Sequence, residues 1–140
     1  MHYSTWVEVD LSAIRHNVRR TREMAGCEVM AVVKANAYGH GAIPVAQAAL
    51  QSGATWLAVA RLDEGLALRQ AGITTPILLL GYIPPQRVEH ALEENISLTV
   101  WRADHLEHIA AIAKRSGHTA RLHLKVDTGM NRLGAPPEEA

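Results

Sequence analysis

Short apolar runs alternate along the chain with longer amphipathic stretches. The runs cover residues 29–33, 56–60, 76–80, 97–101 and 121–126. The first three runs are almost wholly apolar, which is typical of parallel strands covered on both faces. The pattern therefore predicts five strands of a parallel sheet.

The intervals between the runs carry apolar residues at helical spacing and end at glycine or asparagine. The predicted helices cover residues 11–18 after a cap at Asp10 or Ser12, then 43–50, 62–71, 88–92 and 106–113. Strand and helix thus repeat as a β-α unit with a period of roughly 20 to 27 residues.

Five β-α units indicate a parallel α/β architecture, either an open doubly wound sheet or a (β/α)8 TIM-type barrel. Periodicity does not separate these two folds. A complete barrel takes about 250 residues, whereas this chain has 140. If the fold is a barrel, we expect an incomplete one with about five of its eight β-α units. In either fold, functional residues gather just beyond the carboxyl ends of the strands.

Charge and composition narrow the range of partners. The 14 Lys and Arg residues balance the 14 Asp and Glu residues, which argues against binding to nucleic acid or to an anionic membrane surface. A single cysteine, Cys27, excludes an internal disulfide and a thiolate metal site. No apolar run is long enough to span a bilayer, and residues 1–10 lack the features of a signal peptide. We therefore expect a soluble, cytoplasmic protein.

Lys34 directly follows the first apolar run, at the functional end of the predicted sheet. Apolar surroundings disfavour the ammonium form, and the neutral amine is the form that Schiff-base or general-base chemistry requires. On position alone, a strand-end lysine that extends to solvent is the commoner case.

The segment around Lys34 reads VKANAYGHG over residues 33–41 and resembles the pyridoxal-phosphate attachment motif of the alanine racemases. Further segments resemble the same family: residues 7–17, 53–60, 77–81 and 122–134. The resemblance implies an N-terminal (β/α)8 barrel followed by a C-terminal β domain. Residues 1–140 then form the N-terminal part of the barrel domain that binds pyridoxal 5'-phosphate, without the rest of the barrel or the β domain.

The resemblance also implies residue roles. Lys34 would carry the cofactor as an internal aldimine and act as the base on the Cα proton of D-alanine. Tyr38, four residues further on, would contact the cofactor phosphate. Arg132 would contact the cofactor ring oxygen and the substrate carboxylate, a task that suits a planar, permanently charged group.

Lys125 lies on the predicted fifth strand, on the same side as Asp127. A cationic lysine near Arg132 would repel it. Some alanine racemases carbamylate the lysine at this position, and the resulting negative charge holds the arginine. We therefore expect a carbamate on Lys125; the alternative is an ion pair between Lys125 and Asp127 or another carboxylate.

Two other candidates are better explained by structural roles. His105, Glu107 and His108 share one predicted helix, but their order does not match a metalloprotease signature, so we expect a solvated helix face and no metal site. Cys27 has no motif partner, so we expect a buried structural thiol.

The resemblance implies an isomerase that interconverts L-alanine and D-alanine and supplies D-alanine to bacterial peptidoglycan, as a homodimer at full length. Two alternatives stay open: a serine racemase of the same fold, and a non-catalytic fragment that binds pyridoxal phosphate. The family's second base is a tyrosine from the C-terminal domain of the partner subunit. We therefore expect little or no racemase activity from these 140 residues alone.

Overall fold

The computed structural model describes residues 5–140, in which five parallel strands form one sheet in the order β1-β2-β3-β4-β5. The strands are β1 (Val29–Val32), β2 (Ala54–Val59), β3 (Ile77–Leu79), β4 (Ile96–Val100) and β5 (Leu122–Leu124). The helices are α1 (Leu11–Ala25), α2 (Lys34–Tyr38), α3 (Ala42–Leu50), α4 (Leu62–Gln70), α5 (Pro85–Glu93) and α6 (Ala103–Ser116), followed by the 3-10 turn η1 (Pro137–Glu139). All five predicted strands and all five predicted helices are confirmed, with ends that differ by a few residues.

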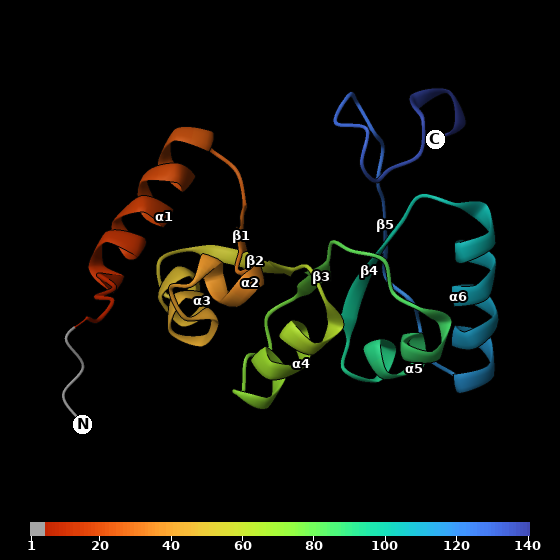
Figure 1. Ribbon diagram of the computed structural model, residues 1–140, viewed down its shortest axis with the longest axis horizontal. Helices are drawn as coiled ribbons and strands as arrows, with labels where there is room; N and C mark the ends of the chain where they lie inside the picture. The colour runs from red at the N-terminus through yellow and green to blue at the C-terminus, as the bar shows by residue number, and fades with distance from the viewer. Residues whose placement is uncertain (1–4) are drawn as a thin grey trace.

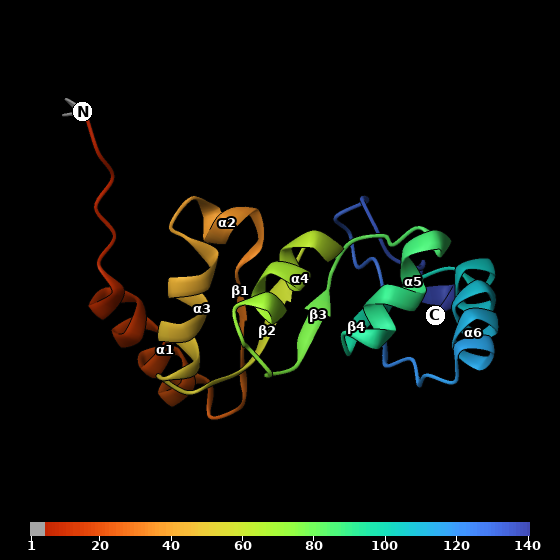
Figure 2. The same cartoon turned by 90° about the horizontal axis from the view of Figure 1, so that it is seen from below.

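The order of the strands separates the two folds that periodicity left open. A doubly wound sheet reverses its strand order at a switch point, whereas consecutive strands of a TIM-type barrel always lie next to each other. Here the units follow one another across the molecule, from α1 and β1 at one end to α6 and β5 at the other (Figures 1 and 2). The fold is therefore that of a TIM-type barrel, with five β-α units.

One face of the sheet packs against the helices and forms the core. Alternate side chains of the strands, such as Leu57, Ile77 and Leu98, belong to the same buried cluster as Leu68 of α4 and Ile109 of α6. All five of these side chains are fully buried. Burial of alternate strand positions against amphipathic helices is the main source of stability of this architecture.

The opposite face of the sheet is concave. The rings of Trp56 on β2 and His123 on β5 lie 5.5 Å apart, edge to face. Two strands separate β2 from β5, so in a flat sheet their backbones would be about 14 Å apart. The ring contact therefore indicates that the sheet curves toward this face, as a barrel wall does.

Several contacts hold the helices on the sheet. Gly65 lets α4 approach closely, since a Cβ there would lie 2.9 Å from Ile96 Cδ1. Arg69, near the end of α4, donates hydrogen bonds to four backbone carbonyls, those of Ile73, Thr75, Glu94 and Asn95. These bonds tie the end of α4 to the end of α5.

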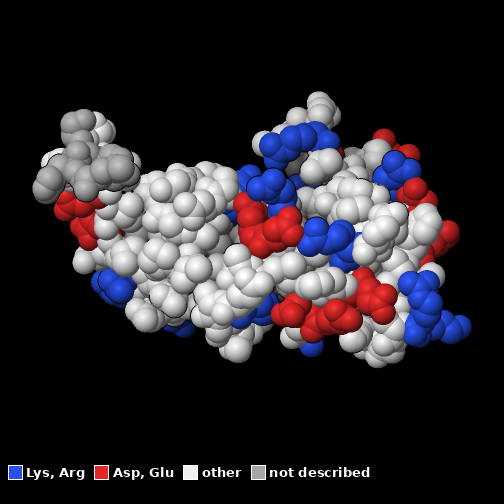
Figure 3. All heavy atoms as spheres, turned by 60° about the horizontal axis from the view of Figure 1, so that its bottom comes forward, with Lys and Arg blue, Asp and Glu red and all other residues white. Residues whose placement is uncertain are grey.

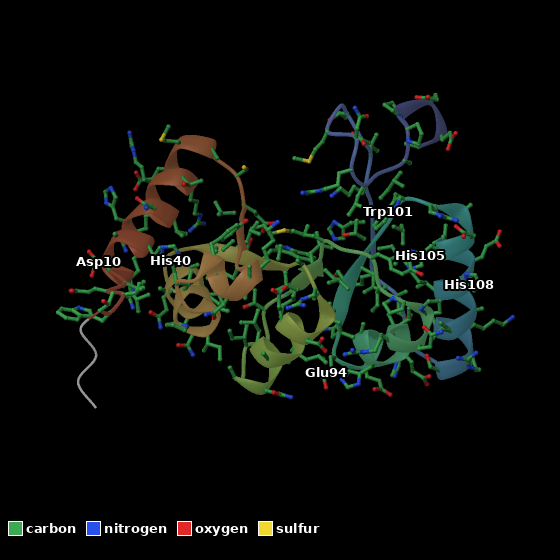
Figure 4. All side chains as sticks on the ribbon, in the orientation of Figure 1. Asp10, His40, Glu94, Trp101, His105 and His108 are labelled. Carbon is green, nitrogen blue, oxygen red and sulfur yellow. The ribbon has the colours of Figure 1, made fainter. Side chains whose placement is uncertain are left out.

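Two predictions about single residues are wrong. His105 is only 4% exposed: its ring nitrogen Nε2 bonds to the carbonyl of Ile83, and its ring packs on Tyr82 and near Trp101. Figure 4 labels His105 and Trp101 at the start of α6. An aromatic neighbour and a carbonyl partner stabilise burial there, whereas His108 does lie on the exposed face. Cys27 is exposed because it lies in the short connection before the edge strand β1.

On the face shown in Figure 3, acidic and basic side chains lie side by side over the part that carries α4, α5 and α6, and neither sign dominates. Among residues 5–140, no helix combines the length and the apolar character needed to cross a bilayer.

Candidate functional site

The carboxyl ends of the strands form a rim, and Lys34 and Arg132 lie at its two extremes. Lys34 begins α2 directly after Val33, and Arg132 lies on the loop that follows the edge strand β5. Backbone hydrogen bonds continue past the strands at this rim, from Val33 N–H to Ala58 O and from Lys125 N–H to Val100 O. The rim is thus a fixed base for both functional segments.

The segment 34–38, which we call the Lys34 turn, is left-handed. The residues from Ala35 to Tyr38 have φ angles between 51° and 55°, and none of them is glycine. A left-handed conformation costs roughly 1–2 kcal/mol per non-glycine residue. Such a turn persists only where surrounding contacts compensate for the strain, and strained backbone of this kind clusters at functional sites.

Two polar side chains, Asn36 within the Lys34 turn and His40 just after it, stabilise the turn locally. The side-chain oxygen of Asn36 accepts a hydrogen bond of 2.8 Å from Ala42 N–H, the first residue of α3. Nδ1 of His40 donates to the carbonyl of Ala37 at 2.9 Å. The turn is therefore joined to the start of the helix that follows it.

Glu64 of α4 holds the Lys34 turn from outside. Its Oε1 accepts a hydrogen bond of 2.7 Å from Ala35 N–H, the amide next to Lys34. Its Oε2 accepts from Ala60 N–H and Arg61 N–H at 2.8 and 3.0 Å, which satisfies free donors at the start of α4. Partial burial acts to raise the pKa of Glu64, but the three N–H donors outweigh it, and the pKa lies below its usual value. The carboxylate is therefore ionised at neutral pH.

Residues 127–134, which we call the Arg132 loop, are held mainly by their own backbone. The base of the loop is closed by hydrogen bonds from Asp127 N–H to Ala135 O and from Ala135 N–H to Lys125 O, both 2.8 Å. Gly134 adopts a φ of 138°, and a Cβ there would lie 2.5 Å from Asp127 N. Only glycine fits at this crossing point.

The carboxylate of Asp127 organises the middle of the Arg132 loop. Its Oδ1 accepts hydrogen bonds from Gly129 N–H at 2.9 Å and from Asn131 N–H at 3.1 Å. These two bonds, with smaller effects from Met130 and Arg132, hold the pKa of Asp127 below its usual value. The described part of the chain shows no ion pair between Lys125 and Asp127, and Oδ1 of Asp127 is bound to backbone donors instead.

The structure brings Lys34 and Tyr38 together but leaves their surroundings open. The Lys34 amine lies 5.9 Å from the centre of the Tyr38 ring. Lys34 is half-buried and Tyr38 is 61% exposed, so the dry apolar pocket expected around the amine is not formed by residues 5–140. Arg132 is exposed at the far edge of the rim, across the sheet from Lys34. Within the same residues, no group of three or more His, Cys, Asp or Glu side chains is placed to hold a metal ion.

Residues 9–140 match the family model described as the N-terminal domain of alanine racemase. The chain belongs to this alanine racemase family. The resemblance inferred from residues 33–41 is thereby confirmed, as is the barrel fold. An alanine racemase of Desulforamulus reducens is 59% identical over 136 residues, and one of Geobacillus kaustophilus is 53% identical over 140 residues.

Solved alanine racemases share the fold of this chain. The crystal structure of alanine racemase from Bacillus anthracis with bound L-Ala-P matches with a TM-score of 0.90 and 46% identity over 99% of this chain. An alanine racemase of Clostridium difficile in complex with cycloserine also matches with a TM-score of 0.90, at 39% identity over 99% of this chain. The chain spans only about a third of its relatives: 37% of the Desulforamulus protein, 36% of the Bacillus anthracis chain and 39% of the Clostridium chain.

The sequence interpretation missed the roles of Glu64 and Asp127, whose carboxylates hold the backbone of the two functional segments. Glu64 lies in the first turn of α4, where an acidic residue is already expected for the helix dipole. Its contact with Ala35 joins residues 29 positions apart and has no local signal. Asp127 is followed two residues later by Gly129, an arrangement that indicates a side-chain turn.

Proposed function

We propose that residues 1–140 form the N-terminal part of the barrel of a pyridoxal-phosphate-dependent alanine racemase, an isomerase that interconverts L-alanine and D-alanine. The observation that carries this proposal is Lys34, a half-buried lysine on a strained turn at the functional rim of an alanine racemase domain. The proposal draws further support from the relatives, since those described above are all named alanine racemases, which favours alanine over serine as the substrate.

The residues present fit the cofactor chemically. A primary amine on a turn at the rim is the group that an aldehyde requires, and the adjacent phenol of Tyr38 is a hydrogen-bond donor suited to a phosphate oxygen. The guanidinium of Arg132, at the same rim, suits an anionic oxygen and a carboxylate. When bound, pyridoxal phosphate supplies the electron sink that stabilises the negative charge left at the substrate Cα.

In this proposal the tasks at the site are divided among Lys34, Tyr38 and Arg132. Lys34 would hold the cofactor through its Nζ, and the free Nζ would take the Cα proton from D-alanine. Tyr38 holds the phosphate. Arg132 orients the cofactor ring and the substrate carboxylate through the planar fork of its guanidinium group. We propose a homodimer as the complete enzyme, in a cytoplasmic pathway that supplies D-alanine to peptidoglycan.

We also propose that Lys125 carries a carbamate. Its neutral amine adds to CO₂, a nitrogen–carbon bond forms, and one proton is released to solvent. Since Asp127 is already bound to backbone donors, the carbamate would provide the negative charge that Arg132 needs. Intact mass measurement at neutral pH, with and without added bicarbonate, tests this modification. An unmodified amine under both conditions contradicts it.

The cofactor proposal is tested by adding pyridoxal phosphate to the natural protein that contains this chain. We expect an absorbance band near about 420 nm, which is typical of a protonated lysine–cofactor linkage. The band is lost in Lys34→Ala and retained in the matched control Lys114→Ala, which removes an exposed lysine of α6. Conversion of L-alanine to D-alanine, measured in parallel, tests the reaction. A band without turnover identifies the non-catalytic alternative, and no band in the wild-type protein contradicts the proposal.

A further inference from the structure

The two oxygens of the Glu64 carboxylate have separate partners. Oε2 accepts from Ala60 N–H and Arg61 N–H, which is an ordinary cap of α4. Oε1 accepts only from Ala35 N–H, which belongs to a different β-α unit. Capping of α4 requires Oε2 but not Oε1. Capping alone therefore does not explain why Oε1 is bound to Ala35 N–H.

We propose that Glu64 is a positioning residue for Lys34: through Oε1 it anchors the strained turn that aims the lysine amine into the site. The inference rests on the proposed function and adds to it a residue that touches neither cofactor nor substrate. Its physical basis is that the Lys34 turn is unfavourable by itself, because each of its left-handed residues is strained. A hydrogen bond from a backbone amide to a carboxylate is stronger than one between neutral groups, so the contact of Ala35 N–H with Glu64 offsets part of that strain.

Glu64 is well suited to this role because its own backbone is rigid. It lies between Leu62 and Gly65, both buried against the sheet, and Gly65 lets α4 approach Ile96 as closely as possible. An anchor on such a base fixes the position of Ala35 relative to β2 and β3. The neighbouring Lys34 amine is thereby held in one direction from the rim, which a mobile turn would not do.

The decisive variant is Glu64→Gln. A glutamine side chain has one acceptor oxygen, so it cannot serve both groups of donors at once. With its oxygen on Ala60 N–H and Arg61 N–H, its NH₂ faces Ala35 N–H, and the anchor is lost while the cap remains. Glu64→Asp is the second variant: its carboxylate still lies in the first turn of α4 but is too short to reach Ala35. Asp63→Asn is the matched control, since Asp63 is the adjacent, exposed residue that pairs with Arg87 instead.

The first readout is amide hydrogen exchange of the Lys34 turn in the cofactor-free natural protein. We expect exchange about tenfold faster in Glu64→Gln and Glu64→Asp than in the wild type, and unchanged in Asp63→Asn, because loss of one charge-assisted hydrogen bond corresponds to a factor of ten or more. Exchange of α6 serves as the internal reference for global stability. Unchanged exchange of the turn in both Glu64 variants overturns the anchor.

The second readout is the affinity for pyridoxal phosphate and the pH at which the absorbance of the bound cofactor changes. We expect about tenfold weaker binding and a shifted titration in the Glu64 variants, with wild-type values in Asp63→Asn. A turn that exchanges faster but leaves both quantities unchanged overturns the positioning role. Wild-type protein that binds no pyridoxal phosphate overturns the proposed function instead, and the exchange readout then still decides whether Glu64 holds the turn.

Discussion

The Lys34 turn and the Arg132 loop both place a cationic side chain at the rim, and both depend on left-handed backbone, but they stabilise it differently. In the Lys34 turn the left-handed positions are occupied by alanine, asparagine and tyrosine, and side-chain acceptors from Asn36 and Glu64 hold them. In the Arg132 loop the positions with positive φ are Gly129, Asn131 and Gly134, and the loop closes on its own backbone.

The difference shows how each segment depends on the rest of the fold. The Lys34 turn is anchored by α4, so its geometry requires the packing of a separate β-α unit. The Arg132 loop receives its main contacts from residues within ten positions of it along the chain. We therefore expect changes in the Arg132 loop to act through sterics and local hydrogen bonds, and changes in the Lys34 turn to act through tertiary anchoring and residue conformation.

The largest expected effect is that of Gly134→Ala. A Cβ at this position meets the backbone at 2.5 Å from Asp127 N and 2.8 Å from Val126 C, so the base of the loop must open. We expect a loss of about 3 kcal/mol or more in the free energy of unfolding. Gly39→Ala, after the Lys34 turn, is the matched variant: its φ is also positive, at 89°, but no atom lies within 4 Å of the added Cβ.

Gly39→Ala should therefore cost only conformational strain, about 1 kcal/mol. Denaturant unfolding of the natural protein, followed by tryptophan fluorescence, measures both values. Equal losses for the two glycines would contradict the steric account of the Arg132 loop.

The next comparison is between two asparagines with positive φ, Asn36 in the Lys34 turn and Asn131 in the Arg132 loop. Asn36→Ala removes the cap on Ala42 N–H and also places a less tolerant residue in a left-handed conformation. Asn131→Ala has the second effect only, since Asn131 enters the loop network through its backbone N–H. We expect losses of about 2 and 1 kcal/mol respectively in the same unfolding measurement. A larger loss for Asn131→Ala would contradict this expectation. It would show that the backbone closure of the Arg132 loop tolerates a less suitable residue less well than the anchored Lys34 turn does.

Replacement of alanine by glycine usually destabilises a helix, but at Ala35 we expect it to stabilise the protein. Glycine adopts a positive φ without penalty, so Ala35→Gly relieves strain of about 1–2 kcal/mol while it adds entropy to the unfolded chain. We expect a net gain of about 0.5–1 kcal/mol in the free energy of unfolding. Ala110→Gly, at an exposed position in the right-handed α6, should lose about 1 kcal/mol. A loss at both positions would mean that the left-handed turn is not the conformation of the free protein.

The sequence predicted regular structure much better than it predicted these two segments. Hydrophobic periodicity located every strand and the five longer helices because burial on one face sets the spacing of apolar residues. It also placed Lys34 and Arg132 at the rim. The left-handed turn escaped prediction because alanine favours right-handed helix, so nothing in Ala35 or Ala37 indicates the opposite hand.

Contacts between distant parts of the chain explain the other differences between the sequence prediction and the structure. The bond from Ala35 to Glu64 depends on how two β-α units pack, and a pattern along one helix does not contain that information. In the same way, His105 is buried because Tyr82 and Ile83 approach it from another unit. Site residues that act on the backbone of a remote loop are therefore the ones most easily missed.

The smallest expected effect is the response of the two carboxylates to acid. The pKa of Asp127 is lowered from 3.8 by backbone donors, and that of Glu64 lies below 4.5. A carboxylate whose pKa is lowered in the folded protein stabilises the fold when the pH is above the ordinary pKa of the unfolded chain. This stabilisation is lost as the pH falls from the ordinary pKa through the lowered pKa. Glu64 should therefore begin to lose its contribution at a higher pH than Asp127.

Variants separate the two contributions. Asp127→Asn keeps an acceptor for Gly129 N–H and Asn131 N–H but does not titrate, so the unfolding midpoint of this variant should fall less steeply than that of the wild type below pH 3.8. In Glu64→Gln, the unfolding midpoint should depend less on pH below pH 4.5 than it does in the wild type. At neutral pH the midpoint of this variant should already be lower, because the anchor to Ala35 is lost. If both variants retain the wild-type slope, neither carboxylate contributes to acid sensitivity, and hydrogen bonding to ionised groups would not be what distinguishes the two rim segments from the rest of the fold.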